Sequence, residues 1–191
     1  MTAHLPRIIG QALKNRRPAL SKTFSHNALS AAVPETIQLS SSAFEDDGNL
    51  PPQYTLDCDR ISPPMAWRGV PPQARGLILV VEDADSPTST PLTHAIVLDL
   101  PPDLPDLFEG DLPSPHHKGV FRHLRKNSMR KTEYPPPDPP PGHGDHRYLF
   151  DLYAVSGALP LPRIPILDDV QQAMPGRILA RGYLTARYRR D

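Results

Sequence analysis

Residues 77–87 read Leu-Ile-Leu-Val-Val-Glu-Asp-Ala-Asp-Ser-Pro, an apolar run that passes into acidic residues and stops at a proline. The unbroken run of large aliphatic residues, within residues 75–82, predicts a central strand that is buried on both faces. Pro87 ends regular structure because its nitrogen carries no hydrogen. The stretch therefore predicts a buried strand whose end carries carboxylates, and strand ends are where a sheet presents polar side chains to a ligand.

Four other segments show the strand pattern, with aromatic, β-branched or alternating apolar residues. They are residues 36–39, 95–100, 146–155 and 183–188. Residues 167–180 instead favour a helix that begins at Asp168 and Asp169, and Pro175 is expected to kink or divide it. An order of strands with one late helix favours two antiparallel sheets or a distorted barrel over a doubly wound fold.

The composition limits the architecture. The chain has 191 residues, which fits one domain with some appended sequence. Its 26 prolines remove many backbone donors and argue against long helices, while 38% hydrophobic residues still suffice for a core. The 11 glycines have no three-residue period, so a collagen-like chain is excluded. We expect a mainly β fold with one or two short helices and long loops stiffened by proline.

Charge and cysteine content exclude several classes of partner. The 21 basic residues balance 21 acidic ones, so no global field attracts nucleic acid or an anionic membrane. The single cysteine, Cys58, excludes an intramolecular disulfide framework and a cysteine-rich zinc module. No apolar stretch is long enough to span a bilayer. These features predict a soluble protein of a reducing compartment, the cytoplasm, with no transmembrane segment and no nucleic-acid partner.

Residues 1–34 form a basic N-terminal extension, and residues 35–191 are expected to form the main domain. The extension has no acidic residue, and its apolar residues recur at helical spacing between Leu5 and Leu13. This spacing predicts an amphipathic helix that packs on its own domain, on a partner subunit or on a membrane surface. Because the predicted strands begin after the extension, we expect a chain without residues 1–33 to unfold cooperatively.

The segment 134–142 contains six prolines in nine residues. It is expected to adopt the polyproline II conformation, which makes no ladder hydrogen bonds. A rigid linker or a ligand for an aromatic groove is one interpretation. The segment leads directly into the predicted strand at His146, however, and proline fixes a backbone at low entropic cost. We therefore favour a stiff wall of a pocket.

Two polar clusters and one isolated histidine carry the candidate chemistry. Residues 82–87 follow one predicted strand, the Gly-Asp-His-Arg sequence of residues 144–147 opens another, and His94 precedes a third. Acids and imidazoles that converge at strand ends can bind an anion, hold a metal or transfer protons. Each also has a structural interpretation: the acids as an Asx turn, His94 as a core histidine and Arg147 as the partner of a carboxylate.

Taken in order, these motifs resemble the phosphatidylethanolamine-binding protein family, in its bacterial, Raf kinase inhibitor-like branch. The similar segments are Tyr54-Thr-Leu-Asp57, Ile61-Ser-Pro-Pro-Met-Ala-Trp67, Asp83-Ala-Asp-Ser-Pro87, Pro139-Pro140 with Gly144-Asp-His-Arg-Tyr148, and Leu179-Ala-Arg-Gly182. One departure is Ala84, which stands where the family has a proline. The resemblance covers most of the chain after the N-terminal extension.

The resemblance implies a β-fold of two antiparallel sheets with a small cavity that binds phosphate, phosphoryl head groups or similar anions, without a metal or cofactor. The implied ligand-binding residues are Asp83, His94, Pro140, Gly144, His146 and Tyr148. The implied structural motif comprises Ser62, Pro63, Trp67, Asp85, Pro87 and Arg147. Imidazole and amide N–H groups would donate to the anion, and Asp83 would orient a histidine or accept an ammonium group. A cis bond between Ser86 and Pro87 is also implied.

Three functions remain open at this stage. The preferred one is a non-enzymatic module that binds a small phosphorylated or anionic ligand and modulates a kinase or another partner. Inhibition of Raf itself is not predicted, and a homodimer is a candidate assembly. An enzyme would use His94 or His146, tuned by Asp83, as general base in a hydrolysis, although no nucleophile lies in a recognisable motif. A metal site would be formed by Asp83, Asp85, His94 and His146, although these residues lack the short ligand spacing typical of metal sites.

Overall fold

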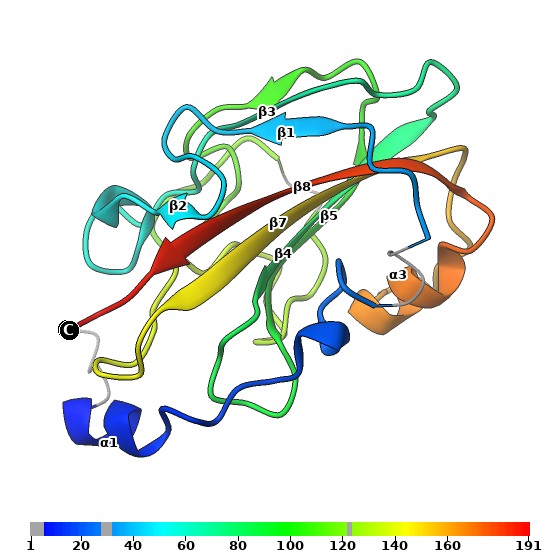
Figure 1. Cartoon of the computed structure of the whole chain (residues 1–191). Helices are drawn as coiled ribbons and strands as arrows, with labels where there is room; N and C mark the ends of the chain where they lie inside the picture. Colours follow the sequence, from blue (N-terminus) through cyan, green and yellow to red (C-terminus); the bar gives the residue numbers. More distant parts are fainter. Residues whose placement is uncertain (1–5, 28–31, 122–123) are drawn as a thin grey trace.

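The computed structural model describes residues 6–27, 32–121 and 124–191. Figure 1 shows two β-sheets stacked against each other, with short helices at the periphery. In chain order the α-helices and strands are α1 (Arg7–Ala12), β1 (Gln38–Ser40), β2 (Gly48–Asn49), β3 (Met65–Arg68), β4 (Gly76–Asp83), β5 (Leu92–Leu100), β6 (Asp106–Leu107), β7 (His146–Val155), α3 (Leu167–Ala173) and β8 (Ile178–Tyr188), and two 3-10 helices span Leu20–Lys22 and Pro52–Tyr54. Within these described ranges, no helix has the length and hydropathy needed to cross a bilayer.

The larger sheet has the strand order β2-β8-β7-β4-β5, and the smaller sheet has the order β1-β3-β6. Neighbouring strands run antiparallel in both sheets, except that β2 runs parallel to β8 at one edge. The predicted mainly β fold of two antiparallel sheets is therefore confirmed, with one short parallel pair added.

The predicted strands are present with shifted boundaries. β5 already begins at Leu92, and β8 begins at Ile178, so the last strand includes residues that the sequence had assigned to a helix. Helix α3 ends at Ala173, because Pro175 cannot donate the hydrogen bond that would continue it. The sequence left open whether Pro175 kinks or divides the helix, and in the structure the helix ends before it.

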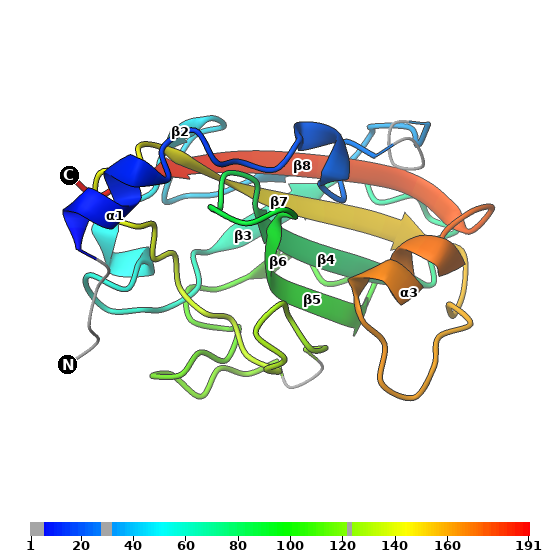
Figure 2. The same cartoon turned by 90° about the horizontal axis from the view of Figure 1, so that it is seen from below.

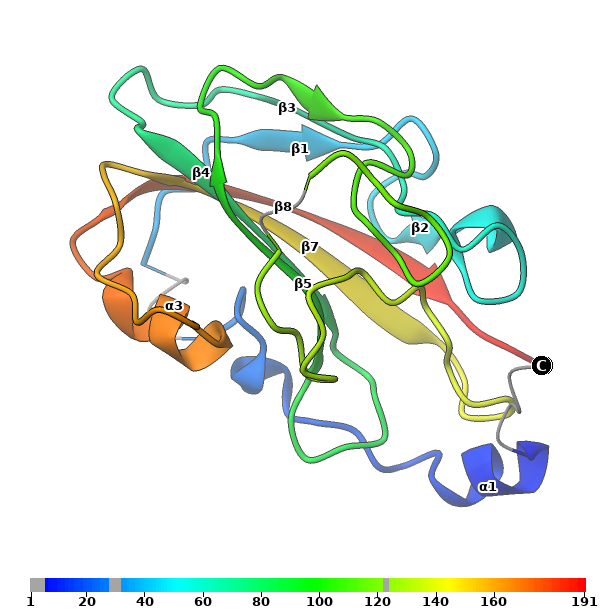
Figure 3. The ribbon, with the colours of Figure 1, turned by 180° about the vertical axis from the view of Figure 1, so that it is seen from behind.

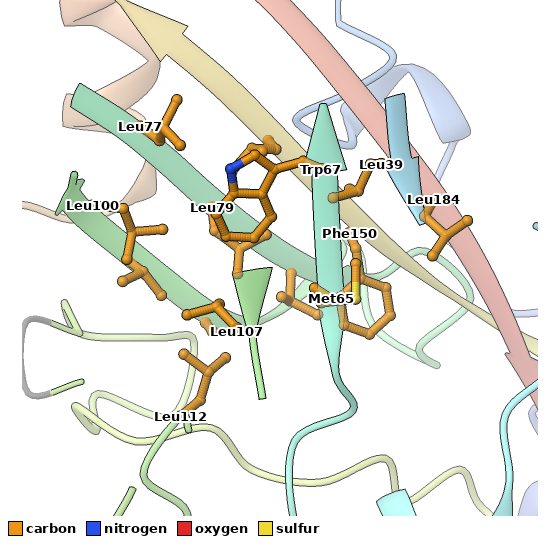
Figure 4. Packing of buried hydrophobic residues seen from close by; sticks show 14 of the residues in the cluster. Leu39, Met65, Trp67, Leu77, Leu79, Leu100, Leu107, Leu112, Phe150 and Leu184 are labelled. Carbon is orange, nitrogen blue, oxygen red and sulfur yellow. The ribbon is translucent and has the colours of Figure 1, made fainter. Parts of the chain in front are cut away.

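Strand β4 lies inside the larger sheet, and each of its residues is buried. On one face, Leu77 and Leu79 pack in the space between the sheets, where Trp67 of β3 lies over them (Figure 4). On the opposite face, Ile78 and Val80 belong to a second core beneath α3. A strand covered on both faces reads as a continuous apolar run, which is why this segment was recognisable in the sequence.

The second core also includes part of the N-terminal extension. Phe24 is only 2% exposed and packs edge-on against Tyr153 of β7, with ring centroids 5.2 Å apart. Its backbone N–H donates to the Glu82 carboxylate at 2.6 Å. The helical spacing in the first residues of the chain did not indicate this contact. A chain without residues 1–33 would lose a core side chain, so its cooperative unfolding is now expected at reduced stability.

Helix α1 packs on its own domain, which is one of the three predicted arrangements. Figures 1 and 2 place it beside the loop that precedes β7. Gly10 is the buried residue of this helix, whereas Ile8 is 73% exposed. A Cβ atom at Gly10 would overlap the carbonyl oxygen of Pro141, so this close approach requires glycine. Leu5, part of the predicted apolar face, lies outside the described residues.

The predicted cis bond between Ser86 and Pro87 is wrong, because the described residues contain no cis peptide bond. The N–H of Thr88 donates to the Ser86 carbonyl at 2.8 Å, and the hydroxyls of these two residues are 2.7 Å apart. Just before them, Asp83 Oδ1 accepts the Asp85 N–H at 2.9 Å in an Asx turn. These local hydrogen bonds close the turn around the trans form that X-Pro bonds ordinarily prefer.

Candidate functional site

The candidate site begins where β4 and β7 lie side by side (Figure 3). Asp83, the last residue of β4, pairs across the ladder with Tyr148 of β7. His146 lies two residues from Tyr148, so strand alternation places all three side chains on the face between the sheets. Asp83 Oδ2 is 2.8 Å from His146 Nδ1, and His146 is completely buried. The antiparallel register thus joins two motifs that are distant in sequence.

A β-bulge brings His94 to the same face. Across the ladder between β4 and β5, Val81 pairs with Ala95, whereas the next residue of β4 pairs with Thr93. His94 is therefore an extra residue on β5, and a bulge of this kind redirects a side chain. Its ring is 2% exposed and meets Tyr148 edge-on, with centroids 5.5 Å apart.

His94 is neutral and presents a hydrogen-bond acceptor to the interior. Its Nδ1 lies 2.7 Å from the Pro135 carbonyl oxygen, which can only accept, so Nδ1 carries the proton. Burial lowers the pKa of His94 below its ordinary value of 6.5, against the opposing effect of the Asp83 carboxylate. Nε2 therefore carries a lone pair at neutral pH, and it has no hydrogen-bond partner among the described residues.

Two buried tyrosines complete the group that we call the inner cluster: Asp83, His94, Tyr134, His146 and Tyr148. Tyr134 is fully buried and Tyr148 is 1% exposed, and neither hydroxyl has a hydrogen-bond partner in the described part of the chain. Burial raises the pKa of both phenols, so each keeps its proton and remains a neutral donor. Because buried polar groups are nearly always paired, unpaired hydroxyls beside two imidazoles favour a site for a polar ligand.

His143 lies against the inner cluster and determines its proton positions. Its Nε2 is 2.9 Å from the Leu13 carbonyl oxygen and therefore carries a proton, while its Nδ1 is 2.7 Å from His146 Nε2. Burial, followed by the nearby His146 and Arg17, lowers the pKa of His143, so the ring is neutral and Nδ1 is an acceptor. It follows that His146 donates a hydrogen bond through Nε2.

The proline-rich segment 134–142 forms one wall of the site. The carbonyl of Pro135 accepts from His94, and the carbonyl of Pro140 accepts the His143 N–H at 3.1 Å. Pro140 itself is buried. The segment is therefore packed on the domain and is not a free linker, while its role as the wall of a ligand pocket stays a prediction.

Asp85 ties the rim of the site together. The Arg147 guanidinium donates to its two carboxylate oxygens at 2.7 and 2.9 Å, and the Arg17 guanidinium lies 2.8 Å from one of them. Burial alone would raise the pKa of Asp85, but the hydrogen bonds from Arg147 and Arg17 outweigh it and lower the pKa to about 2. Asp85 and Arg147 thus hold the turn after β4 to the start of β7, as their structural assignment implies.

An open pocket of about 500 Å³ lies at this rim, and we call it the outer basic pocket. Its lining comprises Lys14, Asn15, Arg17, Asp85, His143, Gly144, Asp145, Arg147 and Arg187. Gly144 has a φ of +100°, a conformation that favours glycine, and it turns the loop beneath the Arg17 guanidinium. Four cationic side chains outnumber two carboxylates here. The pocket thus has a local excess of positive charge although the whole chain is neutral, even with Asp47 paired to Arg187 from outside the lining.

The remaining predicted residues belong to the framework. Trp67 fills the core between the sheets, and Ser62 Oγ accepts the Leu112 N–H at 3.2 Å beside the buried Pro63. Pro87 follows the turn after β4. Among the residues that the structure describes, no group of three or more His, Cys, Asp or Glu is arranged to hold a metal.

Reasoning from the sequence missed three contributors to the site, namely His143, Tyr134 and Arg17. His143 lies three residues before His146 in a motif that was already singled out, so its imidazole was a usable signal. Tyr134 opens the proline-rich segment and was equally visible. No local pattern indicates Arg17, because its guanidinium bonds to carbonyls of residues 143 and 145, far away in the sequence.

Comparisons of the sequence with known proteins agree with this arrangement. A sequence profile described as phosphatidylethanolamine-binding protein matches residues 40–189. A UPF0098 protein of Methanothermobacter thermautotrophicus is 37% identical over 159 residues, covering 81% of this chain and 99% of the relative. A UPF0098 protein of Aquifex aeolicus is 34% identical over 156 residues, covering 81% of this chain and 90% of the relative.

Two solved structures are similar to this fold. A putative phosphatidylethanolamine-binding protein homologue from Chlamydia trachomatis superposes with a TM-score of 0.72 at 31% identity, covering 82% of this chain and 99% of the other. E. coli YbcL, described as a new member of the mammalian family, gives a TM-score of 0.71 at 20% identity with the same coverage, and this second likeness concerns the fold alone.

Proposed function

This chain belongs to the phosphatidylethanolamine-binding protein family, and from that premise we propose that it is a non-enzymatic binding protein for a small anionic or phosphorylated ligand, such as a phospholipid head group. The observation that carries the proposal is the inner cluster, where buried donors without partners lie beside the His146 N–H. Modulation of a kinase or another partner, a homodimeric state and a cytoplasmic location stay predictions.

The donors suit a tetrahedral oxyanion. His146 Nε2–H and the hydroxyls of Tyr134 and Tyr148 supply three hydrogen bonds, and the Asp83 carboxylate lies against the other ring nitrogen of His146. His94 Nε2 accepts, and so it suits a protonated ligand oxygen, such as the P–OH group of a phosphate monoester. The outer basic pocket supplies the positive field that brings the anion to the site.

Hydrolysis is the alternative function. The Asp83–His146 hydrogen bond favours it, because a carboxylate that orients an imidazole is typical of a general base. His146 Nε2 already carries a proton, however, which it donates to His143. Turnover of a phosphate or carboxylate ester that disappears in His146→Ala would favour the enzyme over the binding protein.

Calorimetric titration with sulfate tests the binding function. His146→Ala should weaken sulfate binding by roughly ten- to a hundredfold, since a hydrogen bond to a charged partner contributes about 1.5–3 kcal/mol. His94→Ala should also weaken it at acidic pH, where protonation turns His94 Nε2 into a charged donor. His116→Ala is the matched control, because this histidine contacts Arg60 outside the inner cluster, and its affinity should equal that of the wild type. Affinity that is indifferent to both His94 and His146 would show that these histidines are structural.

A further inference from the structure

The N-terminal extension touches the candidate site although it lies outside the segment that matches the family. The family profile begins at residue 40, whereas Leu13 and Arg17 contact the loop that precedes β7. Figure 2 shows α1 beside that loop. These contacts therefore come from residues outside the segment that the family profile matches.

Polar contacts hold this part of the extension in place. Leu13 accepts the His143 Nε2–H at 2.9 Å, and the Arg17 guanidinium donates to the carbonyls of His143 and Asp145 at 3.1 and 2.8 Å. Arg17 also pairs with Asp85. Apolar burial adds little, since Ile8 is 73% exposed. The polar contacts are hydrogen bonds and an ion pair, the same kinds of contact that a bound anion makes, so they can exchange for those of a ligand.

His143 occupies the position that a ligand oxygen needs. His146 Nε2–H is the donor best placed for an anion, and its hydrogen bond ends on His143 Nδ1 at 2.7 Å. His143 is in turn held by Leu13 on its other nitrogen. The ring of His143 is completely buried, as is that of His146. An anion can accept the His146 hydrogen bond only if His143 moves, and its movement breaks the contact with Leu13.

The extension is anchored behind the part that would move. Phe24 lies in the second core, and the Arg181 guanidinium donates to the Ser25 carbonyl at 2.7 Å. Residues 16–19 have no regular structure and connect this anchor to α1. The chain can therefore release residues 7–17 without opening a core.

We propose that residues 7–17 form a tethered lid that, through His143, occupies the anion's place at His146 and is released when an anion binds. This inference rests on the proposed function, because it assigns the regulation of the same site. The lid lowers the affinity for anions in the closed state, and binding exposes residues 7–17.

Gly10→Ala tests the lid without touching the inner cluster. The new Cβ atom would overlap the Pro141 carbonyl, while alanine favours the helix itself, so the substitution should detach α1 from the loop. Ile8→Ala, on the exposed face of the same helix, is the matched control. We expect Gly10→Ala to bind sulfate several-fold more tightly than the wild type, and Ile8→Ala to bind it equally. Weaker binding by Gly10→Ala would show that the extension completes the site, and would overturn the lid.

Limited trypsin digestion provides the second measurement. Sulfate at saturating concentration should accelerate cleavage after Lys14 and Arg16 of the wild type several-fold, because a released segment is cleaved faster than a docked one. Gly10→Ala should be cleaved quickly with or without sulfate. Sulfate that binds but leaves cleavage unchanged, or slows it, overturns the lid alone. If no variant binds sulfate, the proposed function fails and the lid fails with it.

Discussion

Glu82 and Asp83 are neighbours on β4, yet they meet opposite surroundings. Asp83 faces the space between the sheets, where its carboxylate lies 2.8 Å from the His146 imidazole. Glu82 faces the second core and accepts an uncharged N–H from Phe24. Asp151 of β7 is buried on that same side, where the Ser25 side chain and the Arg181 charge oppose the effect of burial on its pKa only in part.

The buried carboxyl groups on the two faces of the larger sheet therefore have different partners. Between the sheets, the Asp83 carboxylate has an imidazole, that of His146, within hydrogen-bond distance as its partner. In the second core, burial raises the pKa of Glu82 to about 7 although the Phe24 N–H opposes it. Burial, with the nearby Glu82, raises the pKa of Asp151 well above its ordinary value. One face thus places its buried carboxylate against an imidazole, whereas burial on the other face favours the protonated form of the acids.

The largest expected effect tests whether Phe24 is an integral part of the second core. Phe24→Ala should lower the free energy of unfolding by roughly 3–5 kcal/mol, as for other buried phenylalanines, because it empties the space over Tyr153. Urea denaturation followed by circular dichroism measures the change. A loss below about 1 kcal/mol would mean that the extension packs only loosely on this face.

Truncation distinguishes the anchor from the lid. Deleting residues 1–19 keeps Phe24 and should change the free energy of unfolding little. Deleting residues 1–33 should destabilise the chain at least as much as Phe24→Ala, while its unfolding stays cooperative. Equal stability of the two truncated chains would contradict the anchoring role of Phe24.

The next effect concerns the charge of Glu82. Because the pKa of Glu82 in the folded chain is about 7, above its ordinary value of 4.5, the fold favours the protonated acid and loses stability as pH rises from 4.5 through 7. Glu82→Gln keeps an acceptor for the Phe24 N–H and removes this loss. We expect it to be more stable than the wild type by roughly 2–3 kcal/mol at pH 8, and by much less at pH 5.

Thermal or urea unfolding at the two pH values measures this difference. Glu45→Gln is the matched control, because Glu45 is exposed in a loop, and its stability should follow that of the wild type at both pH values. If Glu82→Gln were destabilising at pH 8, the carboxylate would have a charged partner on that face, and the contrast between the faces would disappear.

The second core shows what sequence reasoning could reach. β4 was predictable because an unbroken aliphatic run is a local pattern, and α3 was predictable up to the proline that ends it. The position of Phe24 in this core was not predictable, because a single aromatic residue outside a periodic segment does not indicate which side chains it will contact. The burial of Glu82 was predictable from its place at the end of an apolar strand. Whether a cation pairs with its carboxylate depends on the segments that pack over that face, and the sequence pattern does not indicate them.

The face between the sheets required other information. Asp83, His146 and Tyr148 were grouped by the family resemblance, and the β4–β7 register then explains why they meet. The orientation of His94 depends on a bulge, which interrupts the period-two alternation on which strand predictions rest. The contact of His143 with Leu13 joins segments far apart in the chain, and such packing is not encoded in any short motif.

The smallest expected effect sharpens the role of His94 on this face. Burial holds its pKa below 6.5, so at pH 7.5 its Nε2 only accepts; protonation at lower pH turns it into a charged donor. Sulfate affinity should therefore rise between pH 7.5 and 5.5, by up to roughly tenfold, since protonation of His94 adds a charged donor. Sulfate is the suitable probe, because phosphate itself gains a proton near pH 6.

Calorimetry on His94→Gln decides whether His94 is the source of this pH dependence. Glutamine remains polar but does not titrate, so the rise in sulfate affinity should flatten, whereas the control His116→Ala should keep it. The ligand-free chain changes in the opposite sense: because the folded pKa of His94 lies below its unfolded value, the free energy of unfolding falls as the pH decreases. Titrations therefore belong at temperatures well below unfolding at pH 5.5. An equal rise in His94→Gln would assign the added donor to another group between the sheets, and would leave His94 as a packing residue held by the Pro135 carbonyl.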